Sequence, residues 1–409
     1  AKELIPYAFD QSEKLQEPVL FRTTTRINHS TGVVTLGKIR KPVTRGNFVK
    51  DPLNMVVVPA VARNLHVKLL KNWDAARELA EKSEYNFITG SGDMGIICNG
   101  VSYNYVSDAV KDLDIVDKVR VLRMGFSHPL PPKLIKGFLK ACQKVLIVEE
   151  GEPYMEEAVK AMAQEEGLVL PINGKADGLF TRLYEYNPAQ VKQCIATYFD
   201  LAYTAPEVPD LADLPPVPQR PPTLCAGCSH RATYHEVKKA TEGMDTIFPS
   251  DIGCYTLGLL PPLSAADFLI CMGSSAGTAG GFSRVNPDKK VIAFIGDSTF
   301  FHSGIPGLIN AVYNNHNFTL VILDNGTTAM TGHQPHPGVD MERMNMQGYG
   351  RVSIEKVVRA IGVEHVTLIK PYKVKKSVDA IKESISHKGV SVIISEEICA
   401  LYANALKLP

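Results

Sequence analysis

Disulfide frameworks, basic runs and long apolar segments are missing from this sequence. Eight cysteines in 409 residues are too few for the cross-linked framework of a small secreted domain. Lys and Arg number 44 against 43 Asp and Glu, and no basic run indicates a nucleic-acid or anionic-membrane surface. The least charged stretches, 252–266 and 268–283, are interrupted by Pro261, Pro262, Asp267 and many glycines, so neither supplies the apolar span of about 20 residues that a bilayer needs. The N-terminus carries no secretion signal, and we expect a cytoplasmic protein with reduced thiols and without nucleic-acid or membrane partners.

A proline-rich segment divides the chain. At about 150 residues per domain, the length predicts two or three domains. Seven prolines lie between Pro206 and Pro222, a composition that resists both helix and central strand and is typical of a semi-rigid connector. We therefore place a linker at 206–222, between an upstream domain at 37–205 and a downstream domain at 223–409.

Short apolar runs alternate with helical patterns in both expected domains. Upstream, the pattern predicts strands at 94–98, 119–124 and 145–148, with helices at 103–113 and 133–142. Downstream, it predicts strands at 268–272, 291–295, 319–323, 365–369 and 390–394. Helices are predicted between them, at 305–314, 354–361 and 375–385. This alternation predicts a multidomain α/β fold with parallel sheets. Ligands of such sheets bind outside the carboxyl ends of the strands.

The first 36 residues read as the end of something larger. The chain opens at Ala1 rather than at a methionine and reads almost at once as a strand, and the apolar run 18–21 reads as another. We therefore expect this chain to be part of a longer protein. Glu149, Glu150 and Glu152, which follow the strand at 145–148, are interpreted as a solvated strand end.

Two strands that we expect to be neighbours end in polar residues. Asp297 follows the strand at 291–295, and Asn325 and Thr327 follow the strand at 319–323. A carboxylate, an amide oxygen and a backbone carbonyl suit Mg²⁺, which prefers near-octahedral oxygen ligation. The glycine before Asp297 permits close approach of a ligand, and the helix expected just after it would point unpaired N–H groups at the same place. The pattern predicts a diphosphate held through magnesium.

These motifs resemble a known family. Gly296-Asp297-Ser298 followed by Asp324-Asn325 resembles the signature of thiamine diphosphate enzymes, in which the Asp, the Asn and a carbonyl two residues on hold the metal. Longer stretches are similar to 2-oxoacid:ferredoxin oxidoreductases. The stretch from Asp324 to Pro335 is especially similar to the large (alpha) subunits of those that act on indolepyruvate. The other similar stretches are 225–231, 250–255, 272–275, 296–307, 119–131 and 148–154, together with Thr24, Thr25, Arg26 and His29.

The resemblance implies a fold and a set of site residues. It makes 1–36 the end of a pyrimidine-binding domain, 37–205 a transketolase C-terminal-like α/β domain, and 223–409 a thiamine diphosphate- and magnesium-binding α/β domain. Around the metal ligands Asp297, Asn325 and Thr327 it implies these cofactor-binding residues: Cys228, His230, Asp251, Ile252, Gly253, Cys254, Gly273, Ser274, Ser275, Gly296, Ser298 and Thr299.

The cysteine pair and the histidines admit several interpretations. Cys225 and Cys228 have the spacing of half a zinc site, but no second pair lies about 15–20 residues away; they are otherwise two small thiols in a tight loop or, by the resemblance, a loop against the cofactor. His302, His333 and His336 lie in or after the metal-bearing loops, where imidazole suits proton transfer or carboxylate binding. Structural hydrogen bonding is the alternative, and His333 is the favoured catalytic residue, ahead of His302.

The resemblance also implies an activity and its partners. It implies oxidative decarboxylation of aryl pyruvates such as indolepyruvate to aryl-acetyl-CoA, with coenzyme A, iron–sulfur clusters, ferredoxin and a smaller beta subunit. After Cys271 the chain has only Cys399, so it lacks the cysteine run of a ferredoxin-like module, and we expect clusters only in segments absent from this chain. The alternatives are a non-oxidative thiamine diphosphate decarboxylase or synthase, and a non-catalytic scaffolding subunit.

Overall fold

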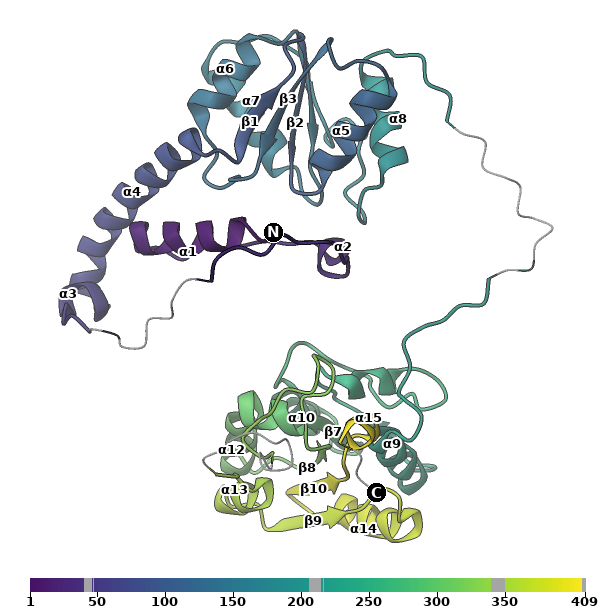
Figure 1. The fold of residues 1–409 in the computed structure, drawn as a ribbon. Coiled ribbons are helices and arrows are strands. Elements are labelled where there is room, and N and C mark those ends of the chain that lie inside the picture. The colour runs from purple at the N-terminus through teal and green to yellow at the C-terminus, as the bar shows by residue number, and fades with distance from the viewer. Residues whose placement is uncertain (40–45, 47, 206–214, 216, 340–349, 407–409) are drawn as a thin grey trace. The chain divides into compact units, whose positions relative to one another are not determined.

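Two parallel or mostly parallel sheets organise the protein. The computed structural model describes residues 1–39, 46, 48–205, 215, 217–339 and 350–406. It divides into two units, Ala1–Asp213 and Leu214–Pro409, each built on a five-stranded sheet (Figure 1). Of the expected linker at 206–222, the described residues form no helix or strand, and 206–214 and 216 lie outside the described residues. Within the described ranges, no helix combines the length and the apolar character needed to cross a membrane.

The first sheet has the strand order β1-β3-β2-β4-β5. Its strands are β1 (Asn86–Thr89), β2 (Met94–Asn99), β3 (Val119–Met124), β4 (Lys144–Val148) and β5 (Ile172–Asn173). All neighbours pair in parallel except β1, which runs antiparallel to β3. The interiors of β2 and β4 are continuous buried apolar runs, as expected for strands covered on both faces.

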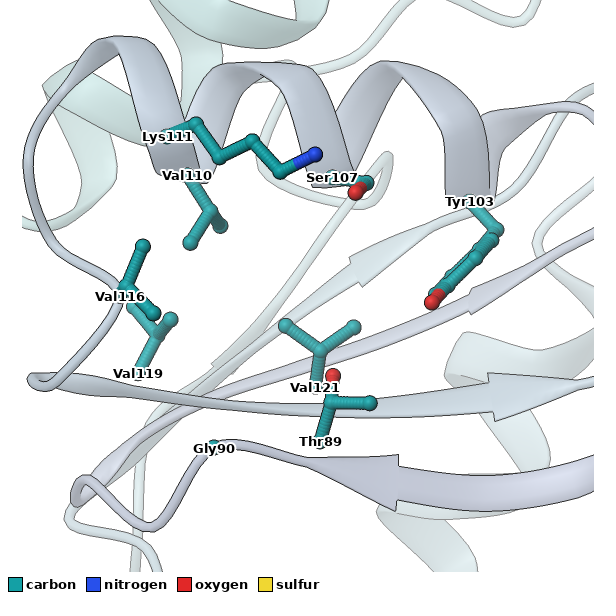
Figure 2. Close-up of a pocket in the computed structure, with 9 residues that line it drawn as sticks. All are labelled: Thr89, Gly90, Tyr103, Ser107, Val110, Lys111, Val116, Val119 and Val121. Carbon is teal, nitrogen blue, oxygen red and sulfur yellow. The ribbon is translucent and has the colours of Figure 1, made fainter.

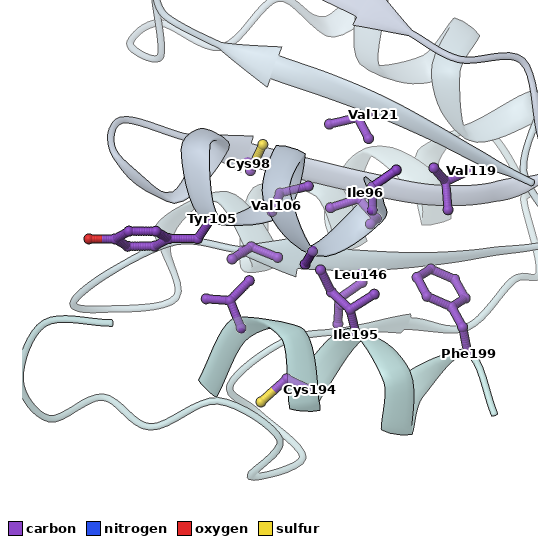
Figure 3. Close-up of a cluster of buried hydrophobic side chains, with 14 of the residues drawn as sticks. Ile96, Cys98, Tyr105, Val106, Val119, Val121, Leu146, Cys194, Ile195 and Phe199 are labelled. Carbon is purple, nitrogen blue, oxygen red and sulfur yellow. The ribbon is translucent and has the colours of Figure 1, made fainter. Parts of the chain in front are cut away.

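Helices cover both faces of this sheet. On one face, α5 (Ser102–Asp112) and α8 (Pro188–Tyr198) enclose a core with β2, β3 and β4, in which Ile96, Leu146 and Ile195 are labelled in Figure 3. On the other face lie α6 (Pro132–Lys140) and α7 (Tyr154–Glu165) (Figure 1). The strands and helices predicted for this region are confirmed.

The N-terminal segment is helical, and the prediction of strands there is wrong. It forms α1 (Leu4–Leu15), α2 (Thr25–Asn28), α3 (Pro52–Met55) and α4 (Pro59–Lys82). Residues 18–21 form no strand, and Leu20 in this run is 96% exposed, so no neighbouring strand is there to pair with it. Arg26 in α2 instead donates hydrogen bonds to the Tyr105 hydroxyl at 2.6 Å and to the Tyr186 carbonyl at 3.2 Å.

The second sheet is wholly parallel, with the order β6-β7-β8-β10-β9. Its strands are β6 (Thr246–Ile247), β7 (Lys290–Gly296), β8 (Phe318–Asp324), β9 (His365–Ile369) and β10 (Val390–Glu396). Four of the five predicted strands are confirmed. The strand predicted at 268–272 is wrong, because Phe268 makes only an isolated bridge to Pro249 and β6 forms the sheet edge instead.

The helices of the second unit form two layers. One core lies against α10 (Ser275–Val285), α12 (Ile305–Tyr313) and α13 (Ile354–Ala360). The other lies against α9 (Ser229–Ala240), α14 (Val374–Ser386) and the 3₁₀ helix η1 (Cys254–Leu259). The short elements α11 (Asp297–Thr299), η2 (Phe300–Gly304) and α15 (Ala400–Ala405) lie near the carboxyl ends of the strands (Figure 1).

Glu149 is buried, so its interpretation as part of a solvated strand end is wrong. Its carboxylate accepts the backbone N–H groups of Met155 at 2.8 Å and Glu156 at 3.0 Å, at the start of α7. Burial raises the pKa of Glu149, against the opposing effect of these two donors. A carboxylate at a helix N-terminus accepts hydrogen bonds from backbone N–H groups that have no partner within the helix. This explains why a charged residue is tolerated in the protein interior. Glu152, by contrast, is exposed.

Asn86 links α4, β1 and the end of β3. Its side-chain amide donates to the carbonyls of Ala80 at 2.9 Å and Phe126 at 3.0 Å, and its oxygen accepts the N–H groups of Gly125 and Phe126 at 2.9 and 2.8 Å. We expect Asn86→Ala to lower the free energy of unfolding by about 2–4 kcal/mol, because buried groups would lose their partners. Urea denaturation followed by the fluorescence of Trp73, the single tryptophan, measures this.

The matched control is Asn104→Ala. Asn104 is exposed on α5, so its replacement should change the free energy of unfolding by no more than about 0.5 kcal/mol. Equal effects of the two substitutions would contradict the role of Asn86.

Candidate functional site

The Asp297 carboxylate joins the ends of two adjacent strands. β7 and β8 pair in parallel, and Asp297 directly follows β7. Its Oδ2 accepts the N–H groups of Asn325 at 3.1 Å and Gly326 at 2.9 Å, and its Oδ1 accepts the N–H of Ser298 at 2.7 Å. The side chain is buried, so these charge-assisted bonds define the turn after β8.

His336 contacts the same carboxylate. Its Nε2 lies 3.0 Å from Asp297 Oδ2, and both side chains are buried. The N–H of Gly338 donates to His336 Nδ1 at 3.1 Å. Since Nδ1 accepts a hydrogen bond, the proton is on Nε2, which donates to Asp297. The ring is therefore the Nε2–H tautomer. His336 is therefore an orienting partner of Asp297.

Asn325 and Thr327 lie beside Asp297, as the sequence predicted. Asn325 Oδ1 accepts the N–H of Thr327 at 3.1 Å, and both residues are buried. The Thr327 hydroxyl oxygen is buried and has no hydrogen-bond partner among the residues that the structure describes. Burial, followed by the negative charges of Asp297 and Glu396, raises the pKa of Asp324 to about 7. This end of the sheet thus gathers several carboxylate and amide oxygen atoms, and Lys370 pairs with Glu396 at 3.0 Å.

A second buried carboxylate, that of Asp251, shapes the neighbouring loops. It accepts the N–H groups of Gly273 at 2.6 Å, Ser275 at 3.2 Å and Ile252 at 3.0 Å. Gly273 has φ +86°, and a Cβ there would lie 2.2 Å from Ser303 Oγ, so only glycine fits. Asp251 therefore fixes the approach to α10, with its own oxygens engaged by backbone. Burial raises its pKa, which the backbone donors oppose.

Tyr255 packs between the two loop systems. Its hydroxyl donates to the Ile252 carbonyl at 2.9 Å and lies 3.3 Å from Thr299 Oγ1. A Cβ at Gly253 or Gly296 would lie 2.3 or 2.5 Å from its ring, so both glycines are required for this packing. Tyr255 thus brings the predicted cofactor residues of the loop at 251–253 close to those of the loop at 296–299.

The remaining predicted cofactor residues differ in placement. Ser298 accepts a hydrogen bond from Thr328 Oγ1 at 2.9 Å, and Ile252 is 39% exposed. Ser274 stands at the N-cap position of α10, but its hydroxyl accepts the N–H of Cys271 at 3.2 Å instead of capping the helix. His230 is buried in α9, neither ring nitrogen has a hydrogen-bond partner among the described residues, and burial lowers its pKa to about 4.

Four cysteines line one cavity of about 90 Å³ at this end of the sheet. They are Cys225, Cys228, Cys254 and Cys399, with His230, Asn325 and His333 among the other lining residues. The N–H of Cys399 donates to the Asn325 carbonyl at 3.0 Å, which ties the chain after β10 to the loop after β8. Cys399 was not predicted as a site residue, although its place just beyond the carboxyl end of a strand was a usable signal.

The cysteine set is not arranged as a zinc site. Across the described part of the chain, no group of three or more His, Cys, Asp or Glu surrounds a single metal position. Burial raises the pKa of the Cys228 and Cys254 thiols, with smaller contributions from the neighbouring cysteines. Nothing in this geometry favours the zinc interpretation of Cys225 and Cys228.

His333 lines the same cavity, whereas His302 does not. The N–H of His333 donates to the Thr328 carbonyl at 3.0 Å, and its backbone has φ +63°. Its ring stacks on Tyr402 in α15, with ring centroids 5.3 Å apart and planes at 12°. Sequence reasoning missed Tyr402. His302 is exposed and makes no side-chain hydrogen bond within the ranges that the structure describes.

Comparisons with known proteins identify relatives of this chain. Residues 251–395 match the family described as thiamine pyrophosphate enzyme, C-terminal TPP binding domain. Indolepyruvate oxidoreductase subunit IorA of Methanothermobacter thermautotrophicus is 44% identical over 99% of this chain and 66% of its own length. Subunit IorA of Archaeoglobus fulgidus is 42% identical over 98% of this chain and 64% of its own length. The 2-oxoglutarate synthase subunit KorB of the latter organism is 28% identical over 42% of this chain and 68% of its own length.

The chain thus spans about two thirds of the length of the curated IorA proteins that it matches. The identity extends over nearly all of its residues, and the matched cofactor-binding domain begins at Asp251 and contains Asp297, Asn325 and Thr327. The chain belongs to the family of indolepyruvate oxidoreductase IorA subunits.

Proposed function

We propose that this chain is the cofactor-binding part of the alpha subunit of a thiamine diphosphate-dependent oxidoreductase. It oxidatively decarboxylates aryl pyruvates, indolepyruvate among them, to aryl-acetyl-CoA and CO₂, and passes electrons through iron–sulfur clusters to ferredoxin. The observation that carries the proposal is the convergence of Asp297, Asn325 and Thr327 at adjacent strand ends within the matched domain. The names of the IorA relatives support the substrate class.

The donor set at the strand ends fits magnesium and a diphosphate. Asp297 Oδ1 accepts a single backbone hydrogen bond, so it can still ligate a metal ion. The Thr327 hydroxyl is buried beside it and has no hydrogen-bond partner among the described residues. Mg²⁺ would take the Asp297 carboxylate, the Asn325 amide oxygen and the Thr327 carbonyl. The diphosphate would lie beside Gly273, Ser274 and Ser275 at the start of α10, where the positive end of the helix dipole favours an anion. The N–H groups of these three residues are themselves hydrogen-bonded to the Asp251 carboxylate and the Cys271 carbonyl, so they would shape this site rather than bind the diphosphate.

Thiamine diphosphate supplies an electron sink that stabilises the carbanion left when CO₂ departs. The chain's own residues orient and enclose this chemistry. Asp297 and His336 hold the loop after β8, Asp251 and Tyr255 hold the loops beside it, and His230 stays neutral near the cavity because burial lowers its pKa. His333, on the cavity wall, is the proposed group that contacts the substrate; the exposure of His302 makes it the weaker candidate.

A smaller beta subunit, ferredoxin and coenzyme A complete the proposed enzyme. A non-oxidative thiamine diphosphate decarboxylase would share the magnesium site but would need no redox centre, and a scaffolding subunit would need neither. The four thiols at the cavity favour the oxidative alternative.

Removing a proposed metal ligand should weaken cofactor binding, and Asn325→Ala is the more direct test because Asp297 also holds the loop after β8. We expect Asp297→Ala and Asn325→Ala to weaken magnesium-dependent binding of thiamine diphosphate at least about tenfold, because each removes a ligand oxygen. Isothermal titration calorimetry with and without Mg²⁺ measures this, and circular dichroism reports the fold. Asp288→Ala, on an exposed loop, is the control and should bind as the parent protein does. Unchanged binding in Asn325→Ala would contradict the metal assignment.

We further propose that Cys225, Cys228, Cys254 and Cys399 hold one iron–sulfur cluster. This differs from the expectation that clusters occur only in segments absent from the chain, which rested on the lack of a ferredoxin-like cysteine run. Among the described residues no group of three or more His, Cys, Asp or Glu surrounds a single metal ion, but a cluster distributes its four thiolate ligands over several iron atoms. Four thiolates are the usual ligand set of a cubane cluster, and all four cysteines line a common cavity that also contacts Asn325. A cluster there would lie beside the proposed thiamine diphosphate site, as electron transfer from that cofactor requires.

Iron analysis tests the cluster. After anaerobic reconstitution, we expect about four iron atoms and four sulfides per chain, the content of a [4Fe–4S] centre. Cys254→Ser and Cys399→Ser should each lower the iron content and change the electron paramagnetic resonance spectrum of the reduced protein. Cys271→Ser, at an exposed cysteine outside the cavity lining, should do neither. Reconstituted protein without iron would overturn the assignment.

Replacing His333 should impair turnover selectively. In the assembled holoenzyme, we expect His333→Ala to lower kcat for aryl pyruvates by about 10²-fold or more, since a positioned hydrogen-bonding or proton-transferring group contributes at least that much. Thiamine diphosphate occupancy, measured by calorimetry, should be retained. His387→Ala, at a histidine outside the cavity lining, should leave kcat unchanged. Equal turnover of the His333 variant and the parent would remove His333 from the mechanism.

A further inference from the structure

A second, larger cavity lies in the first unit, and none of the residues assigned to the proposed reaction lines it. It has a volume of about 210 Å³ and lies between α5 and the strands β1 and β3. Val110, Val116, Val119 and Val121 form its apolar wall (Figure 2). A cavity of about 150 Å³ is enough to hold one benzene ring, so this one has room for a branched or aromatic group with a polar head.

Four polar side chains line the cavity around the apolar wall: Thr89 and Lys111, which are exposed, and Tyr103 and Ser107, which are half-buried. None of the four makes a hydrogen bond or an ion pair to a residue that the structure describes, although the Tyr103 ring packs against Phe87 and Arg123. Figure 2 shows Lys111 extended along α5 toward Ser107, with the Tyr103 hydroxyl directed toward the strands. The unpaired ammonium and three hydroxyls lie around one apolar space, which is the arrangement of a site for an amphipathic ligand.

Several neighbouring charges have other contacts. Asp112 forms an ion pair with Lys192 of α8. Arg120 donates to the carbonyls of Ser91 and Gly92, and Arg123 lies over the Tyr103 ring at 5.0 Å. Lys111 is therefore the lining residue with a charge to offer, and its position in the last turn of α5 places the negative end of the helix dipole nearby. This setting favours a monoanion over a phosphate.

The walls of the cavity are fixed before any ligand binds. β3 is hydrogen-bonded to both β1 and β2, and the loop before it is closed by bonds from the N–H groups of Ile115 and Val119 to the carbonyls of Val110 and Ile115. Gly90 has φ +73°, and a Cβ there would lie 2.3 Å from the Val119 carbonyl oxygen, so the chain passes β3 at the closest distance that glycine permits. A preformed site requires little ordering when a ligand enters.

We propose that this cavity binds a small monocarboxylic acid with a branched or aromatic body. The carboxylate pairs with Lys111 and accepts a hydrogen bond from Ser107, while the body packs against the four valines. The site lies wholly within the first unit, so it stands or falls independently of the proposed cofactor chemistry.

Phenylacetate is the probe that tests this site. The full chain, free of thiamine diphosphate and Mg²⁺, is titrated calorimetrically and by NMR with labelled valine methyl groups. We expect saturable binding with shifts at Val110, Val116, Val119 and Val121, and at least roughly tenfold weaker binding of the neutral analogue phenylacetamide, which lacks the charge. Titration without a saturable shift at these methyl groups would overturn the proposal.

Variants separate this site from others. Lys111→Met should weaken phenylacetate binding at least roughly tenfold, whereas Lys118→Met, an exposed lysine outside the lining, should not. Val116→Trp, at a half-exposed position on the wall, should block binding and leave the melting temperature close to that of the parent. Equal affinity in Lys111→Met, or binding lost in Asp297→Ala, would place the ligand elsewhere and refute the site.

Discussion

The buried carboxylate of Asp297 holds the carboxyl ends of β7 and β8 together, and the geometry of the candidate site depends on it. Its two oxygens accept three backbone N–H groups from the segments that follow both strands, and His336 contacts one of them. Hydrogen bonds to an ionised acceptor in a buried setting are stronger than neutral ones and fix the loops closely. The residue proposed to hold the metal therefore also shapes the turn that presents the other two ligands. Structure and ligation are joined in one side chain.

Asp251 uses the same physical device on the adjoining loops. It accepts N–H groups from Ile252, Gly273 and Ser275, which fixes the start of α10 against the loop before η1. Tyr255 fills the space between the two systems so closely that the facing glycines admit no side chain. Two internal carboxylates and one aromatic ring thus fix the loops at this end of the sheet.

The strand interiors and the polar strand ends were predictable because each is a local pattern. Apolar runs followed by Asp297 or Asn325 identify a buried strand and its carboxyl end without knowledge of the neighbours. The gathering of Cys399 with Cys225, Cys228 and Cys254 was not predictable, because it depends on β10 lying beside β8, and strand order is not written in any local pattern. The interpretation of Glu149 as solvated was wrong for a similar reason, because the N–H groups that permit its burial belong to α7, several residues further along the chain. The prediction of strands near the N-terminus was wrong because an apolar run such as 18–21 forms a strand only beside a partner strand, and no described strand pairs with it.

The two sheets differ in how their buried polar groups are satisfied. In the first unit, Glu149 accepts the N–H groups that start α7, Glu156 accepts the N–H of Lys175, and Lys175 donates back to the Glu149 carbonyl, so these groups complete one another. In the described part of the second unit, the ring nitrogens of His230, the Thr327 hydroxyl and Nδ1 of His333 are buried without hydrogen-bond partners. An unpaired buried polar atom costs on the order of 1–3 kcal/mol, and a fold retains several in one place only where something else compensates. Charge alone does not distinguish the two sheet ends, since both contain carboxylates. The unsatisfied atoms distinguish them, and they assign the cofactor chemistry to the second sheet.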